Sequence, residues 1–467
     1  MTAWLAVLGG GVALLWPALA NRYPILFSDT GGLLEMGLLP DMGWDKPWVY
    51  GPFLLGLHGR TTLWLPALAQ AFLLSHMLWL AQRTLASPRP GSHLALCLGL
   101  AAATAAPWFA SLLMPDIFAP LAVLCVFVLG FGAGRLNRWE LGWAAAVGML
   151  AVASHLAHLV LAAGCLAAVW LVRWRLAWRP ALPLGGALAF LLLSNLLGHG
   201  VLAVSPYGSL FMLARLIGDG PARALLLRDC PAAGYERLCP WVATEPRVGW
   251  TDSDAFLWEP EGPVWSNNRG PILFAPEAAR VVRATVLAYP GEVAAAMVRN
   301  AGRQFFLVRV GDALVPDHLR ATVEPKMQAF FPAEELARYR ASVQQAGALP
   351  ALAAPFAGLH AAVLVLGALG SAVVLARWRQ DWALAGFAAV VLAGLAANAV
   401  ATGALSGPHD RYQARIAWLA VLPPAFALLR RPDGSACRLN KPNAVNLAVL
   451  YAASRATSAG LMRTSAS

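Results

Sequence analysis

A single carboxylate, Asp29, stands in the segment Phe27-Ser28-Asp29-Thr30, directly after the first apolar stretch of the chain. A carboxylate held at the mouth of a membrane helix bundle costs free energy and is therefore a functional candidate. Such a group can take or orient the proton of an attacking hydroxyl. The alternative is structural, because Asp29 or Thr30 could instead cap a helix predicted over residues 29–39.

The loop that follows, over residues 44–53, combines one lysine with several aromatic residues. Tryptophan and tyrosine favour the membrane–water interface, which by itself could explain Trp44, Trp48 and Tyr50. Their ring faces, together with Lys46, could equally line a groove for a sugar or a lipid. We therefore expect Lys46, Trp48 and Tyr50 to contact a substrate.

Asp116 and His155 are further candidates for substrate contact. Asp116 follows Met114-Pro115 at the start of an apolar stretch, where it could also serve only as a helix cap. His155 and His158 lie three residues apart, so one face of a helix could present both. Two histidines are a weak signal for a metal. We expect buried, hydrogen-bonded histidines and leave a divalent metal open.

Arginine supplies the last candidates, in the segment Asp410-Arg411-Tyr412 and at Arg415 one turn later. An arginine near the end of an apolar helix can extend to the interface. Its planar guanidinium can also bind a phosphate through paired hydrogen bonds. We expect Arg411, Tyr412 and Arg415 to contact a substrate. The chain has no Ser-His-Asp order, glycine-rich phosphate loop or haem motif.

The composition of the 467 residues places these candidates in a membrane protein. Hydrophobic residues make up 59% and charged residues 13% of the chain, whereas soluble domains average roughly 45–50% and about 25%. The net charge of +11 could indicate nucleic acid. However, the arginines flank the apolar stretches, as they do on the cytoplasmic side of membrane proteins. We expect an all-α polytopic membrane protein without a nucleic-acid partner.

Apolar stretches of about 18 residues or more indicate membrane spans, and we predict about ten. The stretch 141–172 is expected to form a hairpin that turns near Ser154-His155. A straight helix of that length would measure about 48 Å, more than a hydrocarbon core of about 30 Å. The stretch 3–20 ends like a signal peptide but lacks a basic start, so we expect it to be retained. The predicted spans are 3–20, 61–82, 92–113, 117–134, 141–153, 156–172, 181–200, 355–376, 382–404 and 412–429.

The flanking arginines place both termini in the cytoplasm and divide the chain into four parts. We predict an N-terminal membrane bundle over 1–200, which contains an interfacial external loop at 21–60. A small, mainly helical external domain follows over 201–354. C-terminal membrane helices over 355–429 and a cytoplasmic tail over 430–467 complete the chain.

The predicted external domain contains three helices and two cysteines. The helices, expected at 276–288, 290–308 and 332–345, each open at a proline, which suits a first helical position. Cys230 and Cys239 lie nine residues apart, and an oxidising exterior permits a disulfide between them. Two free thiols are the alternative.

Three features together resemble the GT-C superfamily of integral-membrane glycosyltransferases. Asp29 follows the first span and opens a short helix. Lys46 and Trp48 lead toward the second span, and Arg411 and Tyr412 open a late span. The nearest analogies are bacterial lipid A aminoarabinose transferases and protein O-mannosyltransferases. These enzymes take a sugar from a polyprenyl-phosphate carrier on the non-cytoplasmic face of the membrane.

The resemblance implies a multi-pass transferase of the bacterial inner membrane that moves such a sugar to a lipid or glycan acceptor of the envelope. Asp29 would be the base or would position the acceptor, and Arg411 would bind the phosphate, with Arg415 and Lys46 behind it. The family often has two acids and an Arg-Pro-Pro-type segment, where this chain has one acid and a Lys-Pro-Trp segment. The alternatives are a lipid or sugar transporter (a flippase) and a non-catalytic subunit of envelope assembly.

Overall fold

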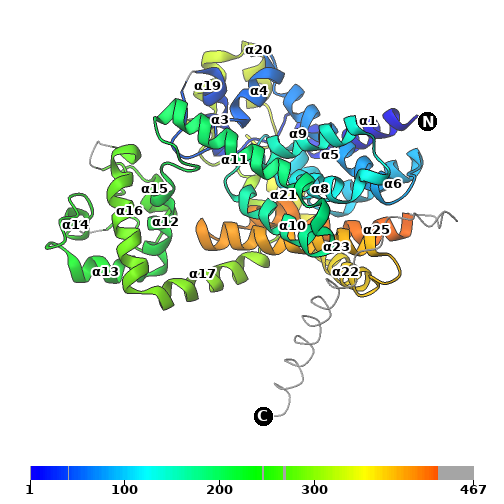
Figure 1. Cartoon of the computed structure of the whole chain (residues 1–467). Helices are drawn as coiled ribbons and strands as arrows, with labels where there is room; N and C mark the ends of the chain where they lie inside the picture. Colours follow the sequence, from blue (N-terminus) through cyan, green and yellow to red (C-terminus); the bar gives the residue numbers. More distant parts are fainter. Residues whose placement is uncertain (1, 40, 245–246, 267–269, 430–467) are drawn as a thin grey trace.

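The computed structural model describes residues 2–39, 41–244, 247–266 and 270–429 as an all-helical chain (Figure 1). Within these residues there is no strand, and the only β-type pairing is an isolated bridge between Ile25 and Leu112. The predicted tail over 430–467 lies outside the described residues.

In this part of the chain, seven helical segments are long and apolar enough to cross a membrane, as expected for a polytopic membrane protein. They coincide with seven of the ten predicted spans. The segments are α5 (Trp64–Leu85); α8 (Phe118–Phe131) with η1 (Pro115–Ile117) and η2 (Gly132–Gly134); α10 (Ala157–Arg173) with η3 (Trp174–Leu176); α11 (Trp178–His199); α22 (Ala357–Ala376) with α21 (Leu349–Ala353) and η5 (Ala354–Phe356); α23 (Trp382–Ala399) with η6 (Val400–Ala404); and α24 (Asp410–Ala417) with η7 (Trp418–Val421) and α25 (Leu422–Leu429).

The other three predicted spans are broken or short. Two of them, 3–20 and 92–113, each divide into two helices, and a proline stands in the first turn of the second helix. A proline cannot continue the preceding helix, because it lacks an N–H group and its ring clashes with the turn before it. Whether these segments cross the membrane stays a prediction. The helices are α1 (Ala3–Ala13), α2 (Trp16–Asn21), α6 (Pro90–Ala103), α7 (Ala106–Ser111) and α9 (Arg138–Ala153).

Helix α8 lies inside the bundle, and each of its residues is buried. It packs against α5, α9, α10 and α11. A helix that is apolar on all sides is stable where neighbours surround it. The predicted hairpin turn at Ser154-His155 is present, because α9 ends at Ala153 and α10 begins at Ala157.

The loop region 21–60 folds onto a distant part of the chain, residues 310–349, at the top of Figure 1. A Cβ atom on Gly31 would lie 2.1 Å from the carbonyl oxygen of Thr322, so this close approach requires a glycine. The buried Glu335 carboxylate accepts hydrogen bonds from the Tyr23 hydroxyl (2.7 Å) and the Leu63 amide (2.9 Å). The helices involved are α3 (Ser28–Leu38), α4 (Tyr50–His58), η4 (Gly311–Ala313), α18 (Leu319–Thr322), α19 (Glu324–Phe330) and α20 (Ala333–Arg340).

Residues 207–293 enclose a second hydrophobic core, and we call this part the side lobe (left in Figure 1). A disulfide joins Cys230 to Cys239 within it. The segment predicted as one domain, 201–354, therefore divides between two cores, because residues 310–349 pack with the bundle. The side-lobe helices are α12 (Gly208–Asp219), α13 (Pro221–Asp229), α14 (Leu238–Val242), α15 (Ser253–Trp258) and α16 (Gly270–Ala288).

The predicted start of a helix at Pro276 is wrong, because α16 begins at Gly270 and continues through this proline. The proline removes one backbone hydrogen bond from the helix. The preceding turn contributes Phe274 and Ala275 to the lobe core. Burial of these apolar side chains offsets the lost bond.

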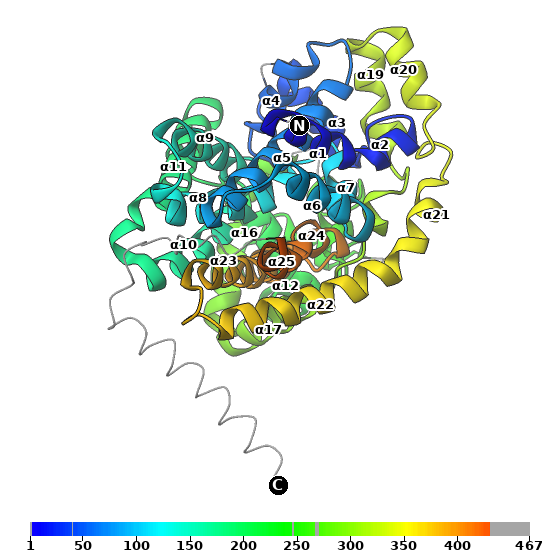
Figure 2. The same cartoon turned by 90° about the vertical axis from the view of Figure 1, so that its right-hand side faces the viewer.

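Helix α17 (Pro290–Phe305) links the side lobe to the bundle. It leaves α16 at an angle of 102° and packs against η6, the π-helical end of α23. A Cβ atom on Gly403 of η6 would lie 2.6 Å from the carbonyl oxygen of Asn300, so the two backbones are in close contact there. Figure 2 shows the molecule from the side opposite to the side lobe, where α23 and α25 lie beside α22.

Candidate functional site

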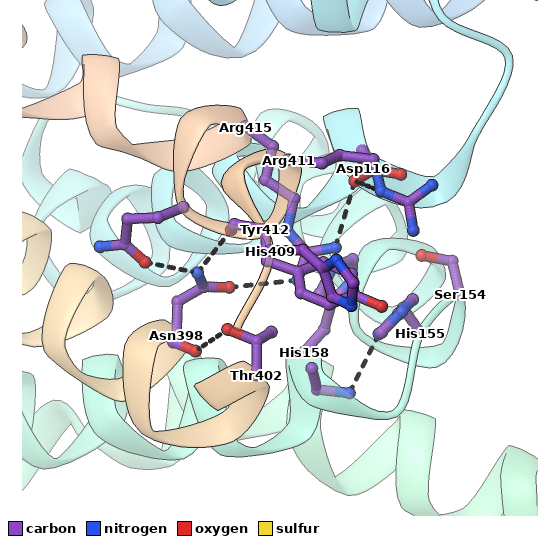
Figure 3. A network of polar contacts seen from close by, with 12 residues as sticks. Asp116, Ser154, His155, His158, Asn398, Thr402, His409, Arg411, Tyr412 and Arg415 are labelled. Carbon is purple, nitrogen blue, oxygen red and sulfur yellow. Dashed lines mark hydrogen bonds and ion pairs between the residues drawn. The ribbon is translucent and has the colours of Figure 1, made fainter. Parts of the chain in front are cut away.

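One carboxylate and two arginines meet inside the bundle (Figure 3). The Oδ1 atom of Asp116, in η1, lies 3.4 Å from Nη1 of Arg415 and 3.7 Å from Nε of Arg411. The two arginines stand one turn apart on α24, so one helical face presents both. Asp116, Arg411 and Arg415 are 1%, 7% and 0% exposed, respectively. We call these three residues the charged centre.

The charged centre has more positive than negative charge. Two guanidinium groups share one carboxylate oxygen. Nη1 of Arg411 and Nε of Arg415 are buried and have no hydrogen-bond partner among the described residues. Buried polar groups normally have partners, and a charged donor without one carries a large desolvation cost. The arrangement therefore favours an additional anion.

Asn398, near the end of α23, orients the arginine helix. Its Oδ1 accepts a hydrogen bond from Nη2 of Arg415 (3.1 Å), and its Nδ2 donates to the carbonyl oxygen of Tyr412 (2.7 Å) and to Oε1 of Gln413 (2.8 Å). The Thr402 hydroxyl donates to the carbonyl oxygen of Asn398 (2.8 Å). These contacts attach α24 to the last turns of α23.

A second set of contacts fixes the backbone just before Arg411. The Gln304 amide forms two reciprocal bonds with the His409 backbone, donating to its carbonyl oxygen (2.8 Å) and accepting from its N–H (2.9 Å). The Arg411 N–H donates to the Asp312 carboxylate (3.1 Å), and the Arg309 N–H donates to Asp410 (2.9 Å). Residues 304–312 thus act as a clamp on the segment that carries Arg411.

Asp29 and Lys46 form an ion pair beside the charged centre, with 3.3 Å between Oδ1 and Nζ. Burial alone would raise the pKa of Asp29, but the positive charges of Lys46 and Arg411 outweigh it and lower the pKa below its ordinary value. Lys46 also contacts Asp45. The Arg411 guanidinium lies over the Phe27 ring, 4.0 Å from its centroid, which connects this pair to the centre.

The alternative role of Asp29 as a helix cap is only partly met. The N-cap of α3 is Phe27, and its backbone N–H donates to the Thr30 hydroxyl at 3.0 Å. Asp29 lies in the first turn of the helix, where a negative charge is favoured. Its side chain is about one-third exposed, at 32%, and points to Lys46. Asp29 is therefore a partly exposed carboxylate that is paired with Lys46 and lies within the electrostatic influence of Arg411.

His155 and His158 lie at the α9–α10 turn, with their ring centroids 5.1 Å apart. Nδ1 of His158 donates to the Ala151 carbonyl oxygen (2.7 Å), and Nδ1 of His155 accepts from the Ala157 N–H (3.1 Å). Burial, and then the positive charge of Arg415, lower the pKa of His155 well below its ordinary value. His155 is therefore neutral at physiological pH and lies within the electrostatic field of the centre.

Trp48 and Tyr50 have structural contacts. Trp48 donates from Nε1 to the Met36 carbonyl oxygen (3.0 Å), and the fully buried Tyr50 hydroxyl donates to Gln70 (3.2 Å). The Tyr50 ring packs on Phe118, two residues after Asp116, at 5.7 Å. Both side chains hold α3 and α4 in place. Tyr412 contributes its ring, which lies 5.2 Å from the Arg411 guanidinium.

The sequence interpretation missed Asn398, Gln304 and Asp312. Asn398 was detectable, because it is a lone amide inside the apolar stretch 382–404, and polar groups in such stretches are usually functional. Gln304 and Asp312 gave no comparable signal, since polar residues are ordinary in a loop-rich segment. Among the described residues, no group of three or more His, Cys, Asp or Glu side chains is placed to hold a metal ion.

Comparisons with protein-family models, with curated proteins and with solved structures found no match.

Proposed function

We propose that this chain is a membrane glycosyltransferase, similar to the GT-C superfamily, that moves a sugar from a polyprenyl-phosphate carrier to an envelope acceptor. The observation that supports it most is that Arg411 and Arg415 share a single carboxylate oxygen of Asp116, while two of their buried N–H groups have no partner in the part of the chain that the structure describes. A phosphate presents several acceptor oxygens and pairs with guanidinium groups through charge-assisted hydrogen bonds. It would supply both the missing partners and the missing negative charge.

The chemistry follows from the placement of Asp29 next to this anion site. The hydroxyl oxygen of the acceptor forms a bond to the anomeric carbon while the bond from that carbon to the phosphate oxygen breaks. Asp29 takes or orients the hydroxyl proton. The lipid phosphate leaves with added negative charge, and Arg411 and Arg415 stabilise that charge in the transition state. Lys46 keeps Asp29 ionised, so that its carboxylate can accept the hydrogen bond that orients the hydroxyl.

The proposal includes a topology. Ten spans with both termini in the cytoplasm would put the α3 start, the α9–α10 turn and the α24 start on one non-cytoplasmic face. The side lobe and residues 310–349 would lie on that face too. The bacterial inner membrane is the compartment that such a carrier and an envelope acceptor imply.

The test uses the purified full chain in nanodiscs with a radiolabelled polyprenyl-phosphate sugar and an envelope lipid extract as acceptor. We expect Asp29→Asn to abolish sugar transfer while the protein still binds undecaprenyl phosphate in native mass spectrometry. Glu35→Gln is the matched control, because Glu35 lies on the same helix and pairs with Lys326 instead. Transfer that is unchanged in Asp29→Asn would remove Asp29 from the mechanism.

A lipid transporter is the second candidate, and one observation favours it. Helix α23 ends in a π-helical segment, η6, and broken helices are common at transport sites. Such a protein would use the same anion site without any chemical change in the lipid. Flux of the labelled carrier across proteoliposomes, with the sugar still attached to it, would support this function over the transferase.

A further inference from the structure

Four aromatic rings from separate segments of the chain meet beside Lys46. Trp44, from the loop region 21–60, lies 5.5 Å from Phe211 of α12, 5.5 Å from Trp258 of α15 and 6.3 Å from Trp265. Phe211 and Trp258 are also in contact, at 6.2 Å. The side lobe therefore completes a patch that the loop alone does not form. We call these four residues the aromatic patch.

The patch is both fixed and accessible. The indole N–H of Trp265 donates to the Leu257 carbonyl oxygen at 2.7 Å, which satisfies its polar group and holds the ring. Trp44 and Phe211 pack against the lobe core. Trp258 and Trp265 remain 45% and 36% exposed. Rigid ring faces are thus presented to solvent with little conformational entropy left to lose.

The patch is continuous with the candidate site. Nζ of Lys46 lies 5.8 Å from the centroid of the Trp258 ring and 3.3 Å from the Asp29 carboxylate. One side chain therefore separates the exposed rings from the proposed base. A molecule lying on the rings would have its next groups beside Asp29.

The neighbouring charges indicate what kind of molecule this is. Glu259 and Glu261, directly after Trp258, are exposed. Carboxylates are costly in hydrocarbon, so they argue against insertion of this surface into the bilayer. They readily accept hydrogen bonds from hydroxyl groups. Aromatic faces carry negative charge and attract the positive edges of C–H groups, and a sugar ring offers both C–H faces and hydroxyls.

We propose that the aromatic patch, with Glu259 and Glu261, binds the saccharide part of the acceptor and places its hydroxyl at Asp29. This inference rests on the proposed transferase function. It adds the side lobe to the acceptor site. In this arrangement the side lobe helps to orient the acceptor. This role accounts for an aromatic patch that is built from two parts of the chain.

The first experiment measures sugar transfer and saccharide binding in Trp258→Ala, Trp265→Ala and the ring-preserving Trp258→Phe. The binding probe is oligosaccharide released from the envelope by mild acid, followed by saturation-transfer NMR. Trp139→Ala is the control, because Trp139 is 74% exposed on α9 and outside the patch. We expect both alanine variants to raise the acceptor KM at least fivefold and to lose the NMR signal. Trp139→Ala should retain both properties, and Trp258→Phe should change both less than Trp258→Ala does.

Two outcomes separate this proposal from the transferase function. Sugar transfer with an unchanged acceptor KM in both alanine variants would overturn the patch and leave the transferase intact. Binding that depends on the tryptophans in a protein without transferase activity would support the patch and reject the transferase. A further test measures how strongly brominated phospholipid in the nanodiscs quenches tryptophan fluorescence. If the quenching falls as much in Trp258→Phe as in Trp139→Phe, the patch lies in the membrane and the proposal is overturned.

Discussion

Two of the buried polar networks in the bundle differ in one respect. In the first, on α5 and α6, the Ser75 hydroxyl contacts the Val7 carbonyl oxygen (2.8 Å) and His93 Nε2 (3.0 Å), and Gln82 contacts His93 Nδ1 (2.8 Å). The second is the charged centre, where two guanidinium nitrogens have no partner among the described residues.

The difference shows how to distinguish structural from functional polarity inside an apolar protein. The Ser75–His93–Gln82 network is neutral, and both ring nitrogens of His93 have partners. A satisfied network of this kind stiffens the core and needs nothing further. In the charged centre, by contrast, two charged groups are buried with donors that have no partner among the described residues, and burying such charge has a cost. Four substitutions test this contrast, beginning with the largest expected effect.

Asp116→Asn should have the largest effect, because it removes the one carboxylate that contacts both buried guanidinium groups. Breaking a buried ion pair by removing one partner costs about 3–5 kcal/mol. The buried thiols Cys97, Cys125 and Cys165 can report unfolding with a thiol-reactive dye in a Cys437→Ser background. Undecaprenyl phosphate should restore part of the lost stability. If Asp116→Asn is as stable as the exposed control Asp317→Asn, then Asp116 does not stabilise the two buried arginines as predicted.

Arg411→Lys should come next, because it keeps the charge but loses the planar pair of donors. Hydrogen bonds to charged groups contribute about 1.5–3 kcal/mol, so undecaprenyl phosphate should bind roughly ten- to a hundredfold more weakly. Titration by native mass spectrometry measures the change. The matched control is Arg309→Lys, where the contact to Asp410 comes from the backbone N–H and survives. Equal affinity in both variants would contradict the phosphate role of Arg411.

Ser75→Ala should have a smaller effect, limited to stability. It removes the hydroxyl partner of His93 Nε2 and leaves this buried nitrogen with only the weak contact to Cys97 Sγ (3.6 Å), at a cost of about 1–3 kcal/mol. Lipid binding and sugar transfer should not change, because the neutral network contacts none of the site residues. A loss of binding here with stability preserved would mean that the two networks are not separate.

Lys46→Gln should give the smallest change, seen only in the pH dependence. The pKa of Asp29 lies below its ordinary value because Lys46 and Arg411 outweigh burial. An acid with a lowered folded pKa contributes stability above its unfolded pKa of about 4 and loses it as pH falls through the folded pKa. Without Lys46, the pKa of Asp29 rises. The acidic limb of the pH–rate profile should therefore move to higher pH, and Lys326→Gln should not move it.

Sequence patterns predicted the long helices well, because an uncharged run of 20 residues has few stable alternatives to a buried helix. They did not predict the interruptions after Ala13 and Ala103, where apolar residues continue and only Pro17 and Pro107 signal a break. Asp29, Lys46, Asp116, Arg411 and Arg415 stand out as candidates because charges are rare near apolar stretches. For Trp48 and Tyr50, composition cannot distinguish a ring that faces a groove from one that anchors two helices, so their binding role stays a prediction.

Helix α17, which follows the bend after α16, is attached to two regions of the molecule. Asn300 donates a hydrogen bond to Asp219 of α12 at 2.8 Å. Gln304, one turn later, donates a hydrogen bond to the His409 carbonyl oxygen. Helix α17 is therefore attached to the side lobe at one turn and to the segment that carries Arg411 at the next. A tilt of the side lobe would therefore displace the backbone segment that carries Arg411.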